Sequence, residues 1–385
     1  MKTNSALDVK NISVLLDGKL VGQLAETNEK KIAFSYSQEW LEDGFSLNPL
    51  YLPLEKKVFI PPNYNFDGLF GIFADSLPDA WGQLLLQRFL AEHGLDPNLN
   101  VLSRLCLVGT SGMGALEYVP SYDFLTDKEI KDIDYLASQC KKILTTEAVS
   151  DIDTLFKMGG SSGGARPKVS LDIDGHPWLI KFPARTDSDN IGEMEYQYSI
   201  CAKQCGIKMS ETHLFPSNYC SGYFGTKRFD RILSKSGMKK VHVGTASGIL
   251  ESDYRAPALD YNTIFKLTRV LTRENRDDVE MLFRLMCFNV FAHNRDDHGK
   301  NFSFIYNQDL CRWELAPAYD LTYSNTFFGE HTTSVNGNGK NPSKSDLLAV
   351  GIKAGLSKNF CVETIDEIES RLFTASSLFQ PYHLI

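Results

Sequence analysis

One block of eight residues constrains this chain more than any other: Asn-Arg-Asp-Asp-His-Gly-Lys-Asn at positions 294–301. An apolar helical pattern over 279–290 runs into the block, and the apolar run 302–306 follows it. Every residue of the block except Gly299 can ionise, coordinate a metal ion or hydrogen-bond. Such groups are costly between buried elements unless they find partners. We therefore expect a functional loop here rather than a solvated turn.

The spacing within and after this block matches the catalytic loop of protein kinases. Asp296 and Asn301 are five positions apart, as are the Asp and Asn of the pattern H-R-D-x-x-x-x-N. In that pattern the Asp accepts the proton of the attacking hydroxyl group, and the Asn holds Mg²⁺. Asp320 follows after a hairpin, where kinases have a second Mg²⁺-binding carboxylate. His298 either orients Asp296, contacts the transferred phosphoryl group, or satisfies backbone groups.

A second candidate site is the turn Gly-Gly-Ser-Ser-Gly-Gly at 159–164. Glycines permit positive φ, and successive amides in such a turn can surround an anion. The turn is not a Walker A sequence, because Gly-Lys-Ser/Thr is missing, and many similar turns are plain linkers. Lys181 lies in an apolar strand pattern further on, and Glu195 lies on the next helix. A strand lysine held by a helix glutamate is typical of kinase small lobes. The alternative is a lysine that reaches solvent, with Glu195 in solvent.

The length of 385 residues predicts two or three domains. Sequence patterns suggest a β-rich domain over 1–125, a connecting helix and small lobe over 126–222, and a helical lobe over 223–385. In the first domain, Asp17-Gly18 between two apolar runs predicts a strand–turn–strand, the alternation over 32–36 predicts another strand, and Ser76 is expected to cap the helix that follows it. The helical period over about 125–155 predicts one connecting helix. The hydrophobic fraction of 43% excludes wholesale disorder. The formal net charge of −8 gives no general attraction to nucleic acid or anionic membranes.

The sequence favours a cytoplasmic protein with no membrane association. The apolar stretches are shorter than a transmembrane helix, and the first residues lack the apolar core of a secretory signal. The eight cysteines are scattered without a Cys-x-x-Cys pair. We therefore expect buried free thiols rather than disulfides or zinc ligands.

Segments spread over nearly the whole chain resemble the HipA family of toxin serine/threonine kinases. In chain order they are FADSLPDAWG, SSGGARPK, WLIKFP, EYQYSICAKQCGI, TKRFDR, NRDDHGKNFSF and LAPAYDLTYS. The resemblance implies an α+β, two-lobed protein-kinase-like fold with an additional N-terminal β-rich subdomain and a mostly helical C-terminal lobe. It also implies that ATP and Mg²⁺ are the cofactors and that a serine or threonine receives the γ-phosphoryl group. The triplet N-R-D and the missing D-F-G fit this family better than conventional protein kinases.

The resemblance also implies a role for each motif residue. Asp296 would be the catalytic base, and Asn301 and Asp320 would bind Mg²⁺. The other implied residues would contact the nucleotide: Gly160, Ser161, Ser162, Gly163, Gly164, Lys181, Glu195, Lys227, Arg228, Phe229, His298 and Lys300. Among them, Lys181 would hold the α- and β-phosphates with Glu195 beside it. The backbone of 227–229 would form the hinge that binds adenine.

Regulation and partners are implied in the same way. Autophosphorylation of Ser161, or of Ser162, would add a charge of roughly −1.5 to −2 where the ATP phosphates bind, and would inactivate the enzyme. The implied substrate is an aminoacyl-tRNA synthetase. The implied partner is a HipB-like helix-turn-helix antitoxin, through which any contact with DNA would be made.

Three alternatives remain open from the residues themselves. One is a phosphoinositide or lipid kinase, and another is a catalytically silent binding protein. The third is a two-metal phosphodiesterase or nuclease built on Asp296, Asp297 and His298. The third alternative leaves the glycine-rich turn and Lys181 unexplained.

Overall fold

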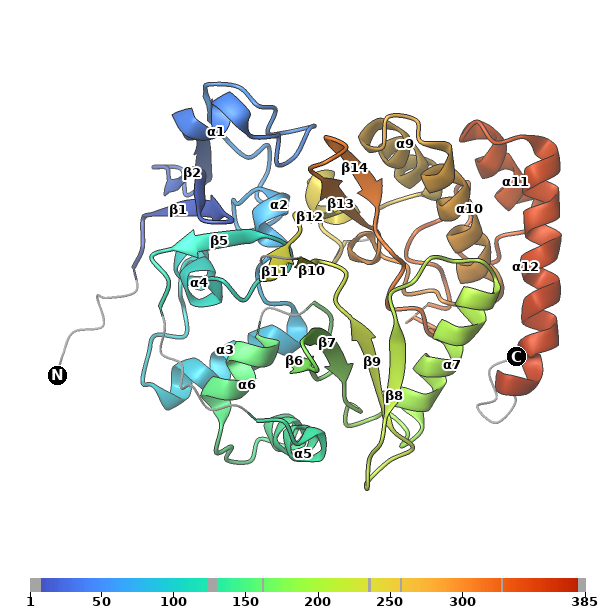
Figure 1. Ribbon diagram of the computed structural model, residues 1–385, viewed down its shortest axis with the longest axis horizontal. Helices are drawn as coiled ribbons and strands as arrows, with labels where there is room; N and C mark the ends of the chain where they lie inside the picture. The colour runs from blue at the N-terminus through green and yellow to red at the C-terminus, as the bar shows by residue number, and fades with distance from the viewer. Residues whose placement is uncertain are drawn as a thin grey trace. The chain divides into compact units, whose positions relative to one another are not determined.

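The computed structural model describes residues 8–122, 130–160, 163–234, 237–256, 258–326 and 328–379 (Figure 1). The chain divides into two compact units: the first holds 1–192 and 213–243, and the second holds 193–212 and 244–385. Each unit combines helices with short antiparallel sheets, which confirms the predicted α+β class. The predicted domain boundaries near 125 and 222 rest on sequence patterns and stay a prediction.

The first unit begins with a five-stranded antiparallel sheet in the order β4-β3-β2-β1-β5. Its strands are β1 (Asn11–Leu16), β2 (Lys19–Glu26), β3 (Ile32–Tyr36), β4 (Val58–Phe59) and β5 (Leu116–Val119). Asp17 and Gly18 join β1 to β2 with φ values of 49° and 76°. Two positive φ values are what a two-residue hairpin turn requires, so the predicted strand–turn–strand is confirmed. Short helices accompany the sheet: α1 (Gln38–Asp43), α2 (Gly71–Ala74) and α4 (Val101–Val108).

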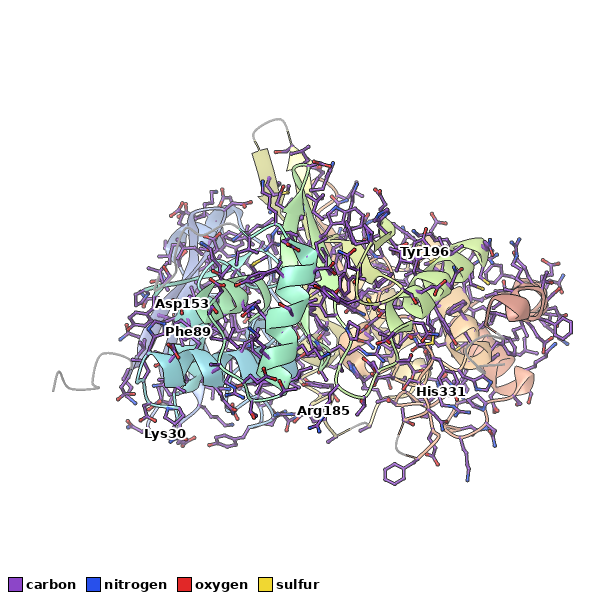
Figure 2. The ribbon with its side chains drawn as sticks, turned by 90° about the horizontal axis from the view of Figure 1, so that it is seen from below. Lys30, Phe89, Asp153, Arg185, Tyr196 and His331 are labelled. Carbon is purple, nitrogen blue, oxygen red and sulfur yellow. The ribbon has the colours of Figure 1, made fainter. Side chains whose placement is uncertain are left out.

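A second sheet in this unit has the order β6-β7-β9-β8. It consists of β6 (Lys168–Ile173), β7 (His176–Lys181), β8 (Thr212–Phe215) and β9 (Tyr223–Lys227). Helices α3 (Ala80–Glu92), α5 (Ile133–Leu144) and α6 (Ile152–Gly159) pack their apolar side chains into one core with it. Phe89 of α3 stacks on Phe156 of α6 at 4.8 Å, and Figure 2 labels Phe89 and Asp153 near this contact.

Two local predictions for this region were wrong. The sequence suggested one connecting helix over about 125–155, but α5 and α6 are separate helices. The chain breaks where Thr146 adopts a φ of 63°, which a continuing helix cannot accommodate. Ser76 was expected to cap the next helix, yet α3 begins after Asp79. The buried Ser76 hydroxyl lies instead 2.8 Å from the hydroxyl of Tyr118.

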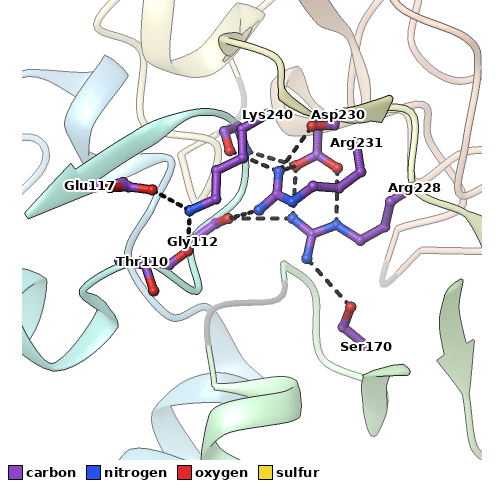
Figure 3. A network of polar contacts seen from close by, with 9 residues as sticks. Thr110, Gly112, Glu117, Ser170, Arg228, Asp230, Arg231 and Lys240 are labelled. Carbon is purple, nitrogen blue, oxygen red and sulfur yellow. Dashed lines mark hydrogen bonds and ion pairs between the residues drawn. The ribbon is translucent and has the colours of Figure 1, made fainter. Parts of the chain in front are cut away.

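A buried ionic network lies in the first unit at the base of a separate hairpin, β10 (Arg231–Ser234) with β11 (Gly237–Lys240) (Figure 3). The Asp230 carboxylate accepts hydrogen bonds from Arg228 Nη2 (2.7 Å), Arg231 Nη1 (2.8 Å) and the backbone N–H of Gly114 (2.8 Å). Burial by itself would raise the pKa of Asp230. The charges and hydrogen bonds around it outweigh burial and lower the pKa to about 2.

The second unit is mainly helical. Its elements are α7 (Ile191–Gln204), β12 (Val243–Thr245), α8 (Ala246–Ile249), α9 (Tyr261–Leu271), α10 (Arg276–Phe291), β13 (Ser303–Asn307), β14 (Arg312–Leu315), α11 (Lys344–Lys353) and α12 (Lys358–Phe379). The buried helix α10 packs against α9, α11 and α12. Helix α10 and the β13–β14 hairpin lie on either side of the 294–301 loop, as the sequence predicted.

All eight cysteines are free thiols. Six of them are buried, as expected, whereas Cys220 is half-buried and Cys311 is exposed. Within the described part of the chain, no helix has the length and apolar character needed to span a bilayer.

The ionic network predicts a pH-dependent loss of stability. Asp230→Asn should destabilise the protein by about 3 kcal/mol at pH 7, because two partly buried guanidinium groups would lose the carboxylate that they share. The pKa of Asp230 is depressed from 3.8 to about 2 on folding. Its stabilising effect is therefore present above pH 4 and is lost as the pH falls toward 2. Urea unfolding at pH 7 and pH 3 should show a smaller gap between wild type and variant at pH 3.

The matched control is Asp43→Asn, which removes the exposed Asp43–Lys19 ion pair. This variant should unfold at nearly the wild-type urea concentration. Equal stability of Asp230→Asn and wild type at pH 7 would contradict the role assigned to the network.

Candidate active site

The glycine-rich turn connects α6 to β6 in the first unit. The N–H of Gly160 donates to Phe156 O at 2.7 Å and ends α6. Gly164 has a φ of +86°, and its N–H donates to the Asp79 carboxylate at 3.1 Å. The N–H groups of both glycines therefore have acceptors within the chain. Ser161 and Ser162 lie outside the described residues, so their predicted nucleotide contacts and autophosphorylation stay predictions.

Two buried lysines lie directly opposite each other beside this turn. The β6–β7 register pairs Lys168 with Lys181, and their exposed fractions are 3% and 8%. Lys168 Nζ donates to the carbonyl oxygen of Gly163. Lys181 Nζ lies 5.6 Å from the centre of the Phe224 ring. Two cationic side chains beside a glycine-rich turn are groups that can bind phosphate oxygens. The sequence analysis predicted Lys181 here but missed Lys168.

Glu195 lies on α7 in the second unit and is buried, as Lys181 is in the first. The alternative in which both side chains reach solvent is therefore wrong. The predicted pairing of Lys181 with Glu195 stays a prediction.

The predicted hinge, 227–229, begins at the last residue of β9. Its first residue, Lys227, lies opposite Trp178 in the β7–β9 register, with Nζ 5.4 Å from the indole ring. The backbone N–H of Arg228 donates to Pro177 O at 2.9 Å, and its side chain is bound to Asp230. Adenine binding by the backbone of 227–229 would therefore use groups other than this N–H.

In the second unit, the 294–301 loop brings its predicted base and metal ligand together. Asn301 Nδ2 donates to the backbone oxygen of Asp296 at 2.7 Å, which closes the loop on itself. The Asp296 side chain is 56% exposed to solvent. His298 Nε2 lies 4.0 Å from this carboxylate, while His298 Nδ1 accepts the N–H of Lys300 at 3.2 Å. His298 thus satisfies a backbone group and also lies near Asp296.

The residue before Asp320, Tyr319, attaches the Asp320 segment to the 294–301 loop. The Tyr319 hydroxyl donates to Lys300 O and lies 2.6 Å from the Ser303 hydroxyl, which ties this segment to the loop. Asp320 itself has a φ of 57°, an uncommon conformation for a non-glycine residue. Lys300 Nζ points over the Tyr254 ring at 4.8 Å.

The oxygen atoms of Asn301 and Asp320 suit Mg²⁺, which completes its shell with water and phosphate oxygens. Over the residues that the structure describes, no group of three or more His, Cys, Asp or Glu side chains is arranged to hold a metal ion.

Asp297 is the site residue whose role the sequence analysis missed. It is fully buried, and it accepts hydrogen bonds from the Tyr261 hydroxyl (2.9 Å) and the backbone N–H of Thr333 (3.1 Å). His331 Nδ1 lies 3.0 Å from the same carboxylate. These partners are more than 30 positions away in the sequence, so no local pattern could reveal them. The engaged carboxylate also weakens the two-metal alternative, which needed Asp297 as a ligand.

The hydrogen bonds that begin at Asp297 continue through Tyr261 to the start of the loop. Asn289 of α10 donates through Nδ2 to the Tyr261 hydroxyl at 2.9 Å, and Asn294 Nδ2 donates to Asn289 Oδ1 at 2.9 Å. The N–H of Thr332 donates to Arg295 O at 2.9 Å. Asn294 and Asp297 are therefore structural, while the intervening Asp296 is exposed.

The two adjacent aspartates should respond to substitution in opposite ways. Asp297→Ala should lower the free energy of unfolding by about 3 kcal/mol, because it leaves several buried donors without an acceptor. Asp296→Asn, on the exposed neighbour, should leave stability within about 0.5 kcal/mol of wild type. Urea unfolding of both variants measures the difference, and a larger loss for Asp296→Asn than for Asp297→Ala would refute this division of roles.

Comparison with known proteins identifies the family of the chain. The chain matches the HipA N-terminal domain over residues 12–119 and the HipA-like C-terminal domain over residues 160–375. Two Sinorhizobium fredii proteins, named "Putative kinase Y4dM" and "Putative kinase Y4mE", are 24% and 25% identical to it. These alignments cover 94% and 82% of this chain and 90% and 77% of the relatives.

Among solved structures, the chain resembles one from the Shewanella oneidensis MR-1 toxin–antitoxin complex of HipA, HipB and operator DNA. The TM-score is 0.71 at 18% identity, with 94% of this chain and 89% of that chain covered. This likeness concerns the fold, and the two domain matches identify the family. The chain belongs to the HipA family.

Proposed function

We propose that this chain is an ATP-dependent kinase that transfers the γ-phosphoryl group to a serine or threonine of a protein. The proposal rests mainly on the 294–301 loop. There the Asp296 carboxylate is exposed, while Asn301 holds the backbone of Asp296 through a hydrogen bond. The names of the two Sinorhizobium fredii relatives and the family membership support kinase chemistry.

Each part of phosphoryl transfer has a residue suited to it. Asp296 accepts the proton of the attacking hydroxyl group, since its carboxylate is exposed and His298 lies beside it. Asn301 and Asp320 would hold Mg²⁺, which would neutralise charge on the phosphates. Lys168 and Lys181 supply positive charge for the phosphates at the glycine-rich turn.

The glycine-rich turn also carries the proposed regulation. Phosphorylation of Ser161, or of Ser162, adds roughly −1.5 to −2 of charge to the turn. Because ATP phosphates would bind at the same turn, charge repulsion then disfavours nucleotide binding. Such a modification makes the kinase self-limiting.

Partners follow from the family. The structural neighbour comes from a complex of HipA with HipB and operator DNA, which supports a HipB-like helix-turn-helix antitoxin as the inhibitor of this chain. Contact with DNA then runs through the antitoxin. The family resemblance suggests an aminoacyl-tRNA synthetase as the substrate, and a cytoplasmic location fits both partners.

Asp296→Asn should lower the rate of phosphoryl transfer from ATP to protein by about 10²–10⁴-fold, because the general base is lost. The measurement follows labelled phosphate from ATP into the proteins of a lysate, with phosphoproteomics of cells that express either form. Growth arrest, if the wild type causes it, should disappear in the variant. Wild-type transfer rates in Asp296→Asn would refute the assignment of the base.

The same assay separates the alternative functions. Label on inositides rather than on protein would indicate a lipid kinase, and no label from wild type with retained antitoxin binding would indicate a silent binding protein. Metal-dependent cleavage of nucleic acid without ATP would indicate a nuclease.

The proposed magnesium site makes a separate prediction. Asp320→Asn should raise the Mg²⁺ concentration for half-maximal transfer by roughly tenfold, because one charged oxygen ligand becomes neutral. Asp309→Asn, on the β13–β14 hairpin turn, provides a control that should keep the wild-type Mg²⁺ dependence. An unchanged Mg²⁺ dependence in Asp320→Asn would exclude this carboxylate as a ligand.

A further inference from the structure

The start of helix α3 is bound to the glycine-rich turn by a reciprocal pair of hydrogen bonds. Asp79 occupies the N-cap position of α3, yet its side chain makes no capping bond to its own helix. The carboxylate instead accepts the N–H of Gly164, 85 positions later, at 3.1 Å. In return, the N–H of Trp81 donates to Gly164 O at 3.2 Å. Gly164 thus satisfies a helix N–H that a cap residue usually satisfies.

Lys168 extends this contact on the other side of the turn. The Trp81 indole Nε1 donates to Lys168 O at 3.0 Å, and Lys168 Nζ donates to Gly163 O. Asp79, Trp81 and Lys168 are all buried. The peptide group between Gly163 and Gly164 is therefore held from both ends. Its oxygen accepts from the Lys168 ammonium group, and its N–H donates to the Asp79 carboxylate.

The backbones themselves meet on the same side of the turn. A Cβ atom added to Gly82 would lie 2.2 Å from Gly160 O, and one added to Gly159 would lie 2.5 Å from Lys168 O. Both distances are too short for a side chain. Gly82 therefore allows α3 to approach the turn at Gly160, and Gly159 allows the end of α6 to approach the start of β6. Residues of α3 thus contact described residues on both sides of the turn.

We infer that the start of α3, through Asp79, Trp81 and Gly82, is a positioning platform that sets the nucleotide affinity of the glycine-rich turn. A turn rich in glycine loses much conformational entropy when a ligand orders it. The contacts at Gly160, Gly163 and Gly164 fix the described residues of the turn and so reduce this loss, and nucleotide binds more tightly. The inference rests on the proposed nucleotide site, and it places the control of that site in the N-terminal domain match, 12–119.

The test compares nucleotide binding in three variants of the full chain. Asp79→Ala removes the acceptor for Gly164, whereas Asp79→Asn keeps an oxygen that can accept the same N–H. Asp132→Ala is the matched control, because Asp132 caps its own helix α5 through the N–H of Tyr135 at 3.0 Å. The dissociation constant of a fluorescent ATP analogue, together with KM and kcat for ATP, is measured for each variant.

Asp79→Ala should raise the dissociation constant and KM about tenfold, the effect of one charge-assisted hydrogen bond, with kcat within about threefold of wild type. Asp79→Asn should lie near wild type. Asp132→Ala should lose stability without a change in either nucleotide constant. Unchanged affinity in Asp79→Ala would overturn the inference. Tighter binding would also overturn it, because the carboxylate would then act as a competitor of phosphate.

Amide exchange separates this inference from the proposed function. If wild type binds no ATP analogue, the proposed nucleotide site fails. The platform is then tested by hydrogen exchange of the peptide covering 163–168, which should be faster in Asp79→Ala than in Asp132→Ala. Equal exchange in these two variants would overturn the platform as well.

Discussion

The buried carboxylate of Asp297 is the interaction on which the 294–301 loop depends. A charge without solvent persists only where hydrogen-bond donors surround it, and here they come from Tyr261, Thr333 and His331. Because the carboxylate is held inside, the next side chain toward the N-terminus, Asp296, is directed outward. The loop can therefore present one exposed carboxylate on a backbone that the buried Asp297 fixes.

The first unit also contains two buried carboxylates that are held by hydrogen-bond donors, Asp230 and Asp79. Asp230 is buried between two arginines and anchors the base of the β10–β11 hairpin. Asp79 is buried at the start of α3 and holds the glycine-rich turn. In each case, a buried acidic side chain joins segments far apart in the sequence. The penalty for leaving such a charge unpaired favours one arrangement over its competitors.

Local patterns predicted much of this architecture, for physical reasons that lie within short segments. The turn at Asp17 and Gly18 requires positive φ values, and the alternation over 32–36 marks a half-buried strand. The apolar residues of α10 recur at helical spacing, so the sequence predicts this helix without knowledge of the helices that pack against it. The same approach misjudged Ser76, because a hydroxyl can cap a helix or bond to a distant tyrosine, and only packing selects between them.

The sequence by itself determined the motifs, their order and the family resemblance, because residue types and spacing persist in the linear chain. It also singled out Asp296 and Asn301, since their five-residue spacing is local and the loop closes on itself. Only the tertiary structure decided that Asp297 is structural, that Lys168 lies opposite Lys181, and that Asp79 serves the turn rather than its own helix. Those outcomes depend on which groups meet across dozens of intervening residues, and burial energies rather than local propensities select the contacts.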